Sequence, residues 1–206
     1  MKMYPPSMVL AVLATLALLA LGAASEQVNP WLQYQPNGTT GGELWRLLTA
    51  HIAHLNLTHA ALNLAALWLI LLWLGEQYHA WEWWLAGTFI SVCISISLWY
   101  WNPELGYYVG LSGTLHGLLI YGLAPLCLQK SLSAWLALLV IGGKIITEQL
   151  YPASSQHTAE LINGAVITDA HLYGAAWGAA AVAIRYAGVM LGGKKNNRIK
   201  LADKSS

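Results

Sequence analysis

Ser112 lies in the string Gly110-Leu111-Ser112-Gly113, directly before a long apolar run. The run predicts a helix that starts at this serine, so the hydroxyl would lie in the first helical turn. Backbone N–H groups without intrahelical partners and the positive end of the helix dipole can stabilise an oxyanion there. A serine hydroxyl needs a neighbouring base to act as a nucleophile. Taken alone, the string is more typical of a capped helix that packs closely against a neighbour.

A histidine in the last apolar segment could supply the base. His171 is followed by Gly174 and Gly178, at offsets of three and seven, so the three residues share one helical stripe. Small residues let a helix approach its neighbour closely, and Gly113 offers a matching small surface. The spacing therefore predicts that His171 reaches the hydroxyl of Ser112.

Two further side chains could bind the oxyanion of a tetrahedral intermediate. His59 and Asn63 are four residues apart on a predicted helix, so they share one face, and both can donate hydrogen bonds. A metal site is the competing interpretation of the histidines in this region. The sequence contains no HExxH motif and no cysteine ligand set, so we expect neither a metal nor another cofactor.

Composition favours a serine–histidine dyad over a triad with aspartate. The only aspartates are Asp169 and Asp203. Asp169 is two residues from His171 and faces another side of any helix, and Asp203 is close to the C-terminus. An aspartyl intramembrane protease, which needs two membrane-embedded aspartates, is excluded for the same reason. His116, four residues after Ser112, is an alternative base. It would lie one helical turn further along the same helix, and therefore deeper if that helix spans a membrane.

The segments that carry these residues are suited to a bilayer. The 206 residues are 57% hydrophobic and 9% charged, whereas soluble domains carry about 25% charged residues. A spanning helix needs roughly 20 apolar residues, and hydropathy predicts six spans in one all-α membrane domain over residues 1–206. Polar loops are expected over Asn29–Ala53 and Tyr151–Asp169. The predicted spans are Met8–Ala24, Leu57–Leu74, Trp83–Tyr100, Ser112–Leu128, Leu132–Leu150 and Ala170–Leu191.

Basic residues set the predicted orientation. With both termini cytoplasmic, eight of the ten Lys and Arg residues lie inside, including those of a basic tail over about 192–206. Trp81, Trp83 and Trp84 would then lie at the inner interface. One alternative concerns the first segment, because Gly22-Ala23-Ala24-Ser25 also resembles the cleavage site of a secretory signal.

Together, these motifs resemble the rhomboid family of intramembrane serine proteases. The matching residues are His54, His59, Asn63, Gly110, Ser112, Gly113, His171, Gly174 and Gly178, with Trp45-Arg46 similar to an element of the family's first outer loop. The resemblance implies a six-helix bundle in which Ser112 attacks a peptide carbonyl and His171 accepts its proton. It also implies an oxyanion held by His59, Asn63 and the backbone N–H of Ser112, and a structural role for His54.

A narrower resemblance is to rhombosortases, which are short bacterial rhomboids. It is carried by the string from Gly110 to Gly117, by Lys144 with Glu148-Gln149, and by Ala170-His-Leu-Tyr-Gly. The resemblance implies an inner-membrane enzyme that opens toward the periplasm and cleaves C-terminal sorting tails, each with Gly-Gly, a membrane helix and a basic cluster. Glu148 and His116 would help to select the tail. A simple ion pair of Lys144 and Glu148 near the outer interface is the alternative.

Three other functions compete with this interpretation. A general rhomboid protease would cut other membrane helices, and a non-proteolytic relative would bind membrane proteins without cutting them. A small transporter with a histidine proton path would need polar residues spread along several spans. Here the polar cluster lies near the outer side, which suits hydrolysis with water from one face. The expected partners are transmembrane proteins and the lipid bilayer, and no nucleic acid.

Overall fold

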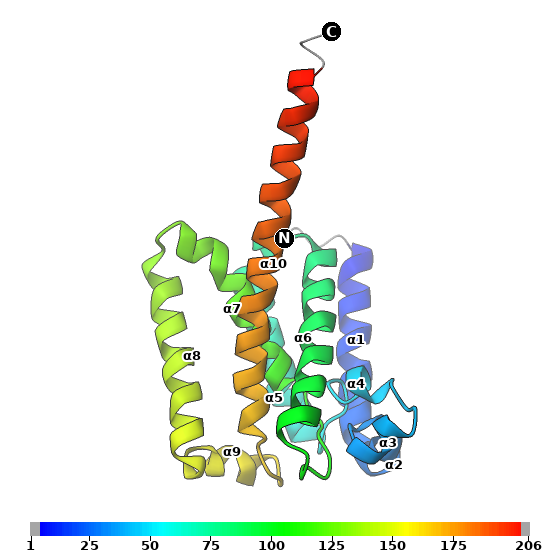
Figure 1. The fold of residues 1–206 in the computed structure, drawn as a ribbon. Helices are drawn as coiled ribbons and strands as arrows, with labels where there is room; N and C mark the ends of the chain where they lie inside the picture. The colour runs from blue at the N-terminus through cyan, green and yellow to red at the C-terminus, as the bar shows by residue number, and fades with distance from the viewer. Residues whose placement is uncertain (1–4, 203–206) are drawn as a thin grey trace.

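The computed structural model describes residues 5–202, and it describes side chains for residues 11–151 and 153–190. Regular structure in this part of the chain is helical, and Tyr34 and Tyr108 form an isolated antiparallel bridge. The longer helices run side by side in a bundle (Figure 1). They are α1 (Pro5–Ala23), α5 (Leu57–Leu74), α6 (Ala80–Trp101), α7 (Ser112–Leu128), α8 (Leu132–Leu150) and α10 (Thr168–Ala202).

Helix α7 lies at the centre of the bundle and contacts α5, α6, α8 and α10. It has 17 residues and is lined by small side chains where it meets α10. The start of α7 faces the lower end of the molecule in Figure 1, where most of the interhelical connections also lie. Ser112, the first residue of α7, therefore faces the end of the bundle where these connections lie, and its helix packs between longer ones.

The two segments expected to be polar loops fold in part into short helices. The first contains part of α2 (Ser25–Leu32), together with α3 (Pro36–Thr40) and α4 (Arg46–Thr49). The second contains the 3-10 turn η2 (Pro152–Ser155) and α9 (Gln156–Leu161). The expectation of loops was wrong here, because proline at the first helical positions and local hydrogen bonds permit single turns that hydropathy does not detect.

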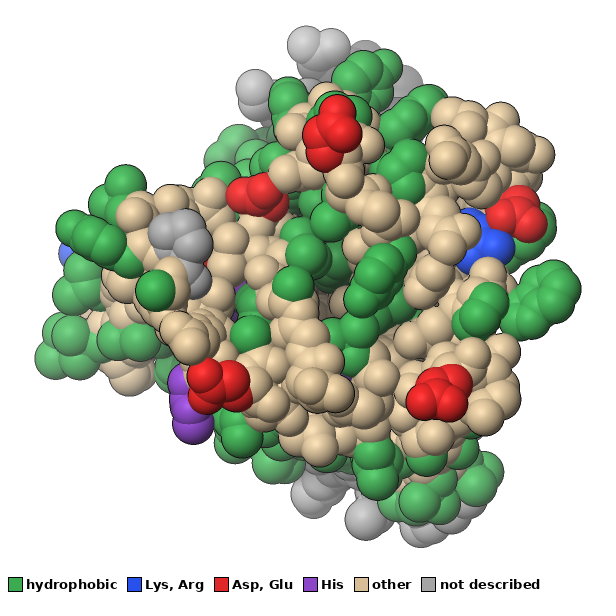
Figure 2. Space-filling model, turned by 90° about the horizontal axis from the view of Figure 1, so that it is seen from below, with side chains coloured by type: hydrophobic (Ala, Val, Ile, Leu, Met, Phe, Trp, Pro, Cys, Tyr) green, Lys and Arg blue, Asp and Glu red, His purple; other side chains and the backbone are tan. Residues whose placement is uncertain are grey.

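Several helix starts are fixed by side chains. The Asn56 side chain accepts a hydrogen bond from the backbone N–H of His59 and caps α5, at 2.9 Å. His79 and Glu82 form a capping box at the start of α6. Seen from the end that carries the longer connections, the surface shows hydrophobic side chains scattered among backbone and uncharged polar groups, with a few separate acidic side chains (Figure 2).

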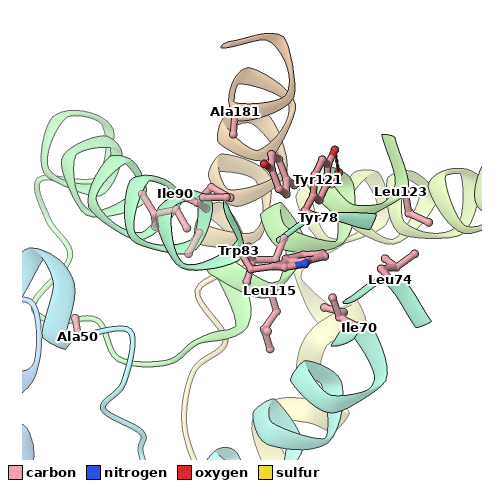
Figure 3. Packing of buried hydrophobic residues seen from close by; sticks show 14 of the residues in the cluster. Ala50, Ile70, Leu74, Tyr78, Trp83, Ile90, Leu115, Tyr121, Leu123 and Ala181 are labelled. Carbon is pink, nitrogen blue, oxygen red and sulfur yellow. Dashed lines mark hydrogen bonds between the residues drawn. The ribbon is translucent and has the colours of Figure 1, made fainter. Parts of the chain in front are cut away.

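The hydrophobic core at the opposite end of the bundle is aromatic. Tyr78 stacks on Tyr121 with ring centroids 4.3 Å apart and donates a hydrogen bond to the Tyr121 carbonyl (Figure 3). Trp83 packs edge-on against both rings and donates to the carbonyl of Gly75. Trp83 is thus buried in this cluster, whereas Trp81 and Trp84, which were predicted to lie with it at the inner interface, are exposed.

The described residues include three helical segments long and apolar enough to cross a membrane, Leu57–Gln77, Ala80–Trp101 and Leu132–Leu150. The pair α1 and α2, bent by 99°, would make four. Helix α7 is shorter, and α10 carries basic residues in its second half. The structure therefore supports a helical membrane bundle, while six spans and the direction of the termini stay predictions. The side chains of the predicted basic tail lie outside the described residues, as does Lys2.

Candidate active site

The hydroxyl of Ser112 and the imidazole of His171 meet between α7 and α10. The Ser112 Oγ lies 3.0 Å from Nε2 of His171. His171 is buried, and Ser112 is the first residue of α7. The structure thus brings together the two residues that the sequence predicted as nucleophile and base.

Glycine contacts hold the two helices at this distance. A Cβ at Gly174 would overlap the carbonyl oxygen of Gly113, and one at Gly178 would overlap the carbonyl oxygen of Gly117. A Cβ at Gly113 would in turn lie 2.7 Å from the carbonyl oxygen of Ala170. The predicted glycine stripe therefore packs backbone against backbone, and any side chain there would push His171 away from Ser112.

The second ring nitrogen of His171 contacts a carboxylate. Nδ1 lies 2.9 Å from Oε2 of Glu148, which is 6% exposed. An ionised carboxylate only accepts hydrogen bonds, so Nδ1 carries the proton and Nε2 is free to accept one from Ser112. Glu148 was predicted to help select substrates, and that role stays a prediction. Its position one turn after Lys144 in a predicted span signalled a paired carboxylate, because an unpaired one would be costly there, but not the contact with His171.

Lys144 and His116 extend the network on the other side of Glu148. Nζ of Lys144 lies 2.5 Å from Oε1 of Glu148 and 3.2 Å from Nε2 of His116. Nδ1 of His116 is 2.8 Å from the carbonyl oxygen of Ser112, and its ring stacks on that of His171, with centroids 4.2 Å apart. Both nitrogens of His116 are thus engaged away from the Ser112 hydroxyl, which disfavours His116 as the base.

His59 and Asn63 lie beside Gly110, two residues before Ser112. Both are buried on α5, and Nδ1 of His59 lies 3.3 Å from the backbone N–H of Leu55. That N–H donates to Nδ1, so Nε2 carries the proton. The amide nitrogen of Asn63 is buried and has no hydrogen-bond partner within the described residues. Two donors are therefore available near the nucleophile.

Gly110 makes room for these donors. Its φ is +125°, a conformation that favours glycine, and a Cβ there would lie 2.7 Å from Cε1 of His59. The Gly110 backbone N–H donates to the carbonyl of Ala50, and its carbonyl accepts from the Tyr108 hydroxyl. The first glycine of the motif is thus required by backbone geometry and by contact with His59.

His54 supports the region from behind. Its ring packs edge-on against that of His59, with centroids 5.1 Å apart, and Asn29 donates to its carbonyl oxygen. Burial, together with the charge of His59, lowers the pKa of His54 to about 4. A neutral ring at neutral pH fits the supporting position predicted for this residue.

Trp45 and Arg46 organise the connection that covers this end of the bundle. The guanidinium of Arg46 is buried, pairs with Glu43, and donates to the carbonyls of Gln33 and Pro30. The Trp45 indole donates to the carbonyl of Trp31. Backbone hydrogen bonds between Tyr34 and Tyr108 then join this connection to the segment before Ser112.

His51 makes a buried network that the sequence did not predict. Nε2 lies 3.0 Å from the hydroxyl of Ser95, which itself donates to the carbonyl of Leu47. Nδ1 lies 3.1 Å from the hydroxyl of Thr114, so the ring joins α6 to the first turn of α7. Burial lowers the pKa of His51 to about 3. The sequence gives no signal for this network, because Ser95 and Thr114 are single polar residues in two separate apolar runs.

Three of these side chains could in principle hold a metal ion. One ligand atom each of His116, Glu148 and His171 lie within 4.8 Å of one another. The ammonium of Lys144 contacts two of the same three side chains. A cation would therefore lie beside the amino group of Lys144, so this donor set fits a metal poorly.

Comparison with known proteins bears on the whole arrangement. The pattern that defines the Rhomboid domain matches residues 41–188, which is more than half of the chain. The matched range includes α5 to α8, Ser112 and His171. A search of curated proteins gave no match.

Proposed function

The chain belongs to the rhomboid family of intramembrane serine proteases, and we propose that it hydrolyses peptide bonds of membrane-anchored proteins with Ser112 as nucleophile and His171 as base. The observation that carries this proposal is the 3.0 Å contact between Ser112 Oγ and His171 Nε2. It lies within hydrogen-bond reach, which a general base needs.

The contacts suggest the order of proton transfers. Ser112 Oγ attacks the carbonyl carbon of the scissile bond while His171 Nε2 accepts its proton. The resulting imidazolium then gives that proton to the leaving amine as the C–N bond breaks, which leaves an acyl-enzyme on Ser112. A water molecule, deprotonated by His171, attacks the acyl carbon and releases the carboxylic acid product, and the proton returns to Ser112.

The negative oxygen of each tetrahedral intermediate needs donors that already point toward it. We assign this role to Nε2–H of His59, the side-chain amide of Asn63 and the backbone N–H of Ser112. The unpaired, buried amide of Asn63 supports the assignment, because such a group is costly unless a partner arrives. Donors fixed before the reaction stabilise charge without reorganisation.

For location, we propose a six-span domain in a bacterial inner membrane, with both termini cytoplasmic and the active site open toward the periplasm. The placement of Lys and Arg supports this orientation. Ser112 starts α7 and His171 lies in the first turn of α10, at the end of the bundle that carries most of the connections, which supports entry of water from that side.

For substrates, we propose proteins with a C-terminal tail of Gly-Gly, a membrane helix and a basic cluster, as the rhombosortase resemblance implies. Glycines lack side chains, so their backbone can enter a narrow site beside Ser112 and unwind from a helix at low cost. Basic residues after the helix would hold its end at the cytoplasmic face.

One comparison tests the proposed specificity. The purified protein in detergent is incubated with a reporter that carries a Gly-Gly tail, with the same reporter after Gly-Gly→Val-Val, and with an ordinary rhomboid substrate helix. We expect cleavage of the first reporter alone. Equal cleavage of all three would leave a general rhomboid protease, and binding of all three without cleavage would leave a non-proteolytic relative.

A further inference from the structure

We propose that Glu148 is a positioning residue for His171, so that the site works as a Ser112–His171–Glu148 triad instead of a dyad. This inference rests on the proposed function and deepens it. The carboxylate comes from α8, whereas the histidine and the serine come from α10 and α7. Three helices would thus contribute one group each to a single line of hydrogen bonds.

The distances form a continuous line. Glu148 Oε2 is 2.9 Å from His171 Nδ1, and His171 Nε2 is 3.0 Å from Ser112 Oγ. The carboxylate fixes the proton on Nδ1, which orients the ring and leaves the Nε2 lone pair toward the serine. When His171 takes the serine proton, the imidazolium lies directly beside a negative charge. These are the two tasks of the acidic member in serine protease triads.

The surrounding side chains favour an ionised Glu148 and direct one of its oxygens toward His171. It is buried, and a buried carboxylate must be paired to stay ionised. Lys144 occupies Oε1 and leaves Oε2 for the histidine. The stacked ring of His116 covers one face of the His171 ring. The side chain of Lys144 is 45% exposed and binds Oε1 from the outer side of the site. Oε2 of Glu148 faces inward, toward His171.

Its role differs from that of an ordinary surface ion pair. If Glu148 were only the i,i+4 partner of Lys144 on a lipid-facing helix, Lys144 would be its only contact, and both side chains would point away from the bundle. Here the side chain of Glu148 is 7% exposed and contacts a residue on another helix. Asp169, the acidic residue nearest to His171 in sequence, is instead bonded to Asn102.

The test measures how fast a fluorophosphonate reagent labels Ser112 in detergent, so it needs no natural substrate. Glu148→Gln keeps the size of the side chain but can place an N–H opposite Nδ1, which forces the proton onto Nε2. We expect labelling to slow by about 100-fold or more, since the corresponding change in a soluble protease costs about 10⁴. Glu148→Asp keeps the charge and should retain more activity than Glu148→Gln. Glu104→Gln, on an exposed residue, is the matched control and should label at the normal rate.

Nitrogen-15 spectra of the histidine side chains separate positioning from packing. The neutral ring of His171 should carry its proton on Nδ1 in the wild type and on Nε2 in Glu148→Gln, while tryptophan fluorescence shows unchanged thermal unfolding. If Glu148 only fills space, Gln should act like Glu and Asp should be worse. Normal labelling of Glu148→Gln would overturn the triad and leave the dyad intact. Labelling that persists in Ser112→Ala would instead contradict the proposed function.

Discussion

Gly174 of α10 packs against the backbone of Gly113 so closely that a methyl group would overlap the Gly113 carbonyl oxygen. Gly113 follows Ser112, and Gly174 lies one turn after His171. This backbone contact therefore sets the separation between nucleophile and base. It explains why two residues 59 positions apart in the chain lie within hydrogen-bond distance.

The contact predicts a strong effect of one methyl group. Gly174→Ala should force α10 away from α7, lower the unfolding temperature and reduce cleavage, since overpacking typically costs about 1–3 kcal/mol. Gly188→Ala is the matched control on the same helix, because nothing lies within 4 Å of a Cβ there. Thermal unfolding and cleavage rates of both variants check this. A Gly174→Ala protein as stable and active as Gly188→Ala would contradict the account.

Removal of the Asn63 amide should slow catalysis more than it weakens binding. The loss of one oxyanion donor typically costs about 10²–10³ in rate, so Asn63→Ala should lower kcat strongly and change KM little. Steady-state kinetics on a cleavable membrane reporter separate the two constants. An unchanged kcat would remove Asn63 from the proposed oxyanion site.

Acid should destabilise the fold through His51. Its pKa is about 3 in the folded protein against an ordinary value of 6.5, so below pH 6.5 the unfolded chain binds a proton that the folded protein does not. Stability from this group is complete above pH 6.5 and falls as the pH drops, by about 2 kcal/mol at pH 5. Unfolding temperatures from pH 7.5 to 5 should fall less steeply in His51→Gln. His157→Gln, on an exposed residue, is the control and should behave like the wild type. If the unfolding temperature of His51→Gln fell as steeply with pH as in these two proteins, His51 would not be the source of the acid sensitivity.

Single cysteines should report the predicted orientation. In a background that lacks Cys93 and Cys127, Ser154→Cys between α8 and α10 should react with a membrane-impermeant thiol reagent added to intact cells. Ser206→Cys should react only after the membrane is opened. Labelling of Ser206→Cys in intact cells would overturn either the six-span assignment or its direction.

Sequence patterns predicted the local elements well and the long-range contacts unevenly. Hydropathy located α5, α7 and α8 at the bounds that the structure has. These helices are largely apolar, and polar connections flank them, so the change in hydropathy marks where each one begins and ends. The glycine stripe predicted the contact of α10 with α7, because small residues leave few alternatives.

Contacts between polar groups on different helices were harder to predict. The aspartate positions pointed to a dyad, and Glu148 was predicted either to help select substrates or to pair with Lys144. Its contact with His171 was missed, since spacing along one helix shows the i,i+4 pair and not which oxygen faces another helix. The network of His51 was missed for a related reason. Ser95 and Thr114 lie in separate helices, and only their packing makes them neighbours.

Cleavage by a set of three variants tests the central claim most directly. Ser112→Ala, His171→Ala and the double variant are purified in detergent and compared with the wild type on the same membrane-anchored reporter. We expect each single variant to lose cleavage and the double variant to be little worse, because the two groups act as a unit. Tryptophan fluorescence confirms that each variant is folded. Cleavage at the wild-type rate by folded Ser112→Ala would contradict the assignment of Ser112 as the nucleophile.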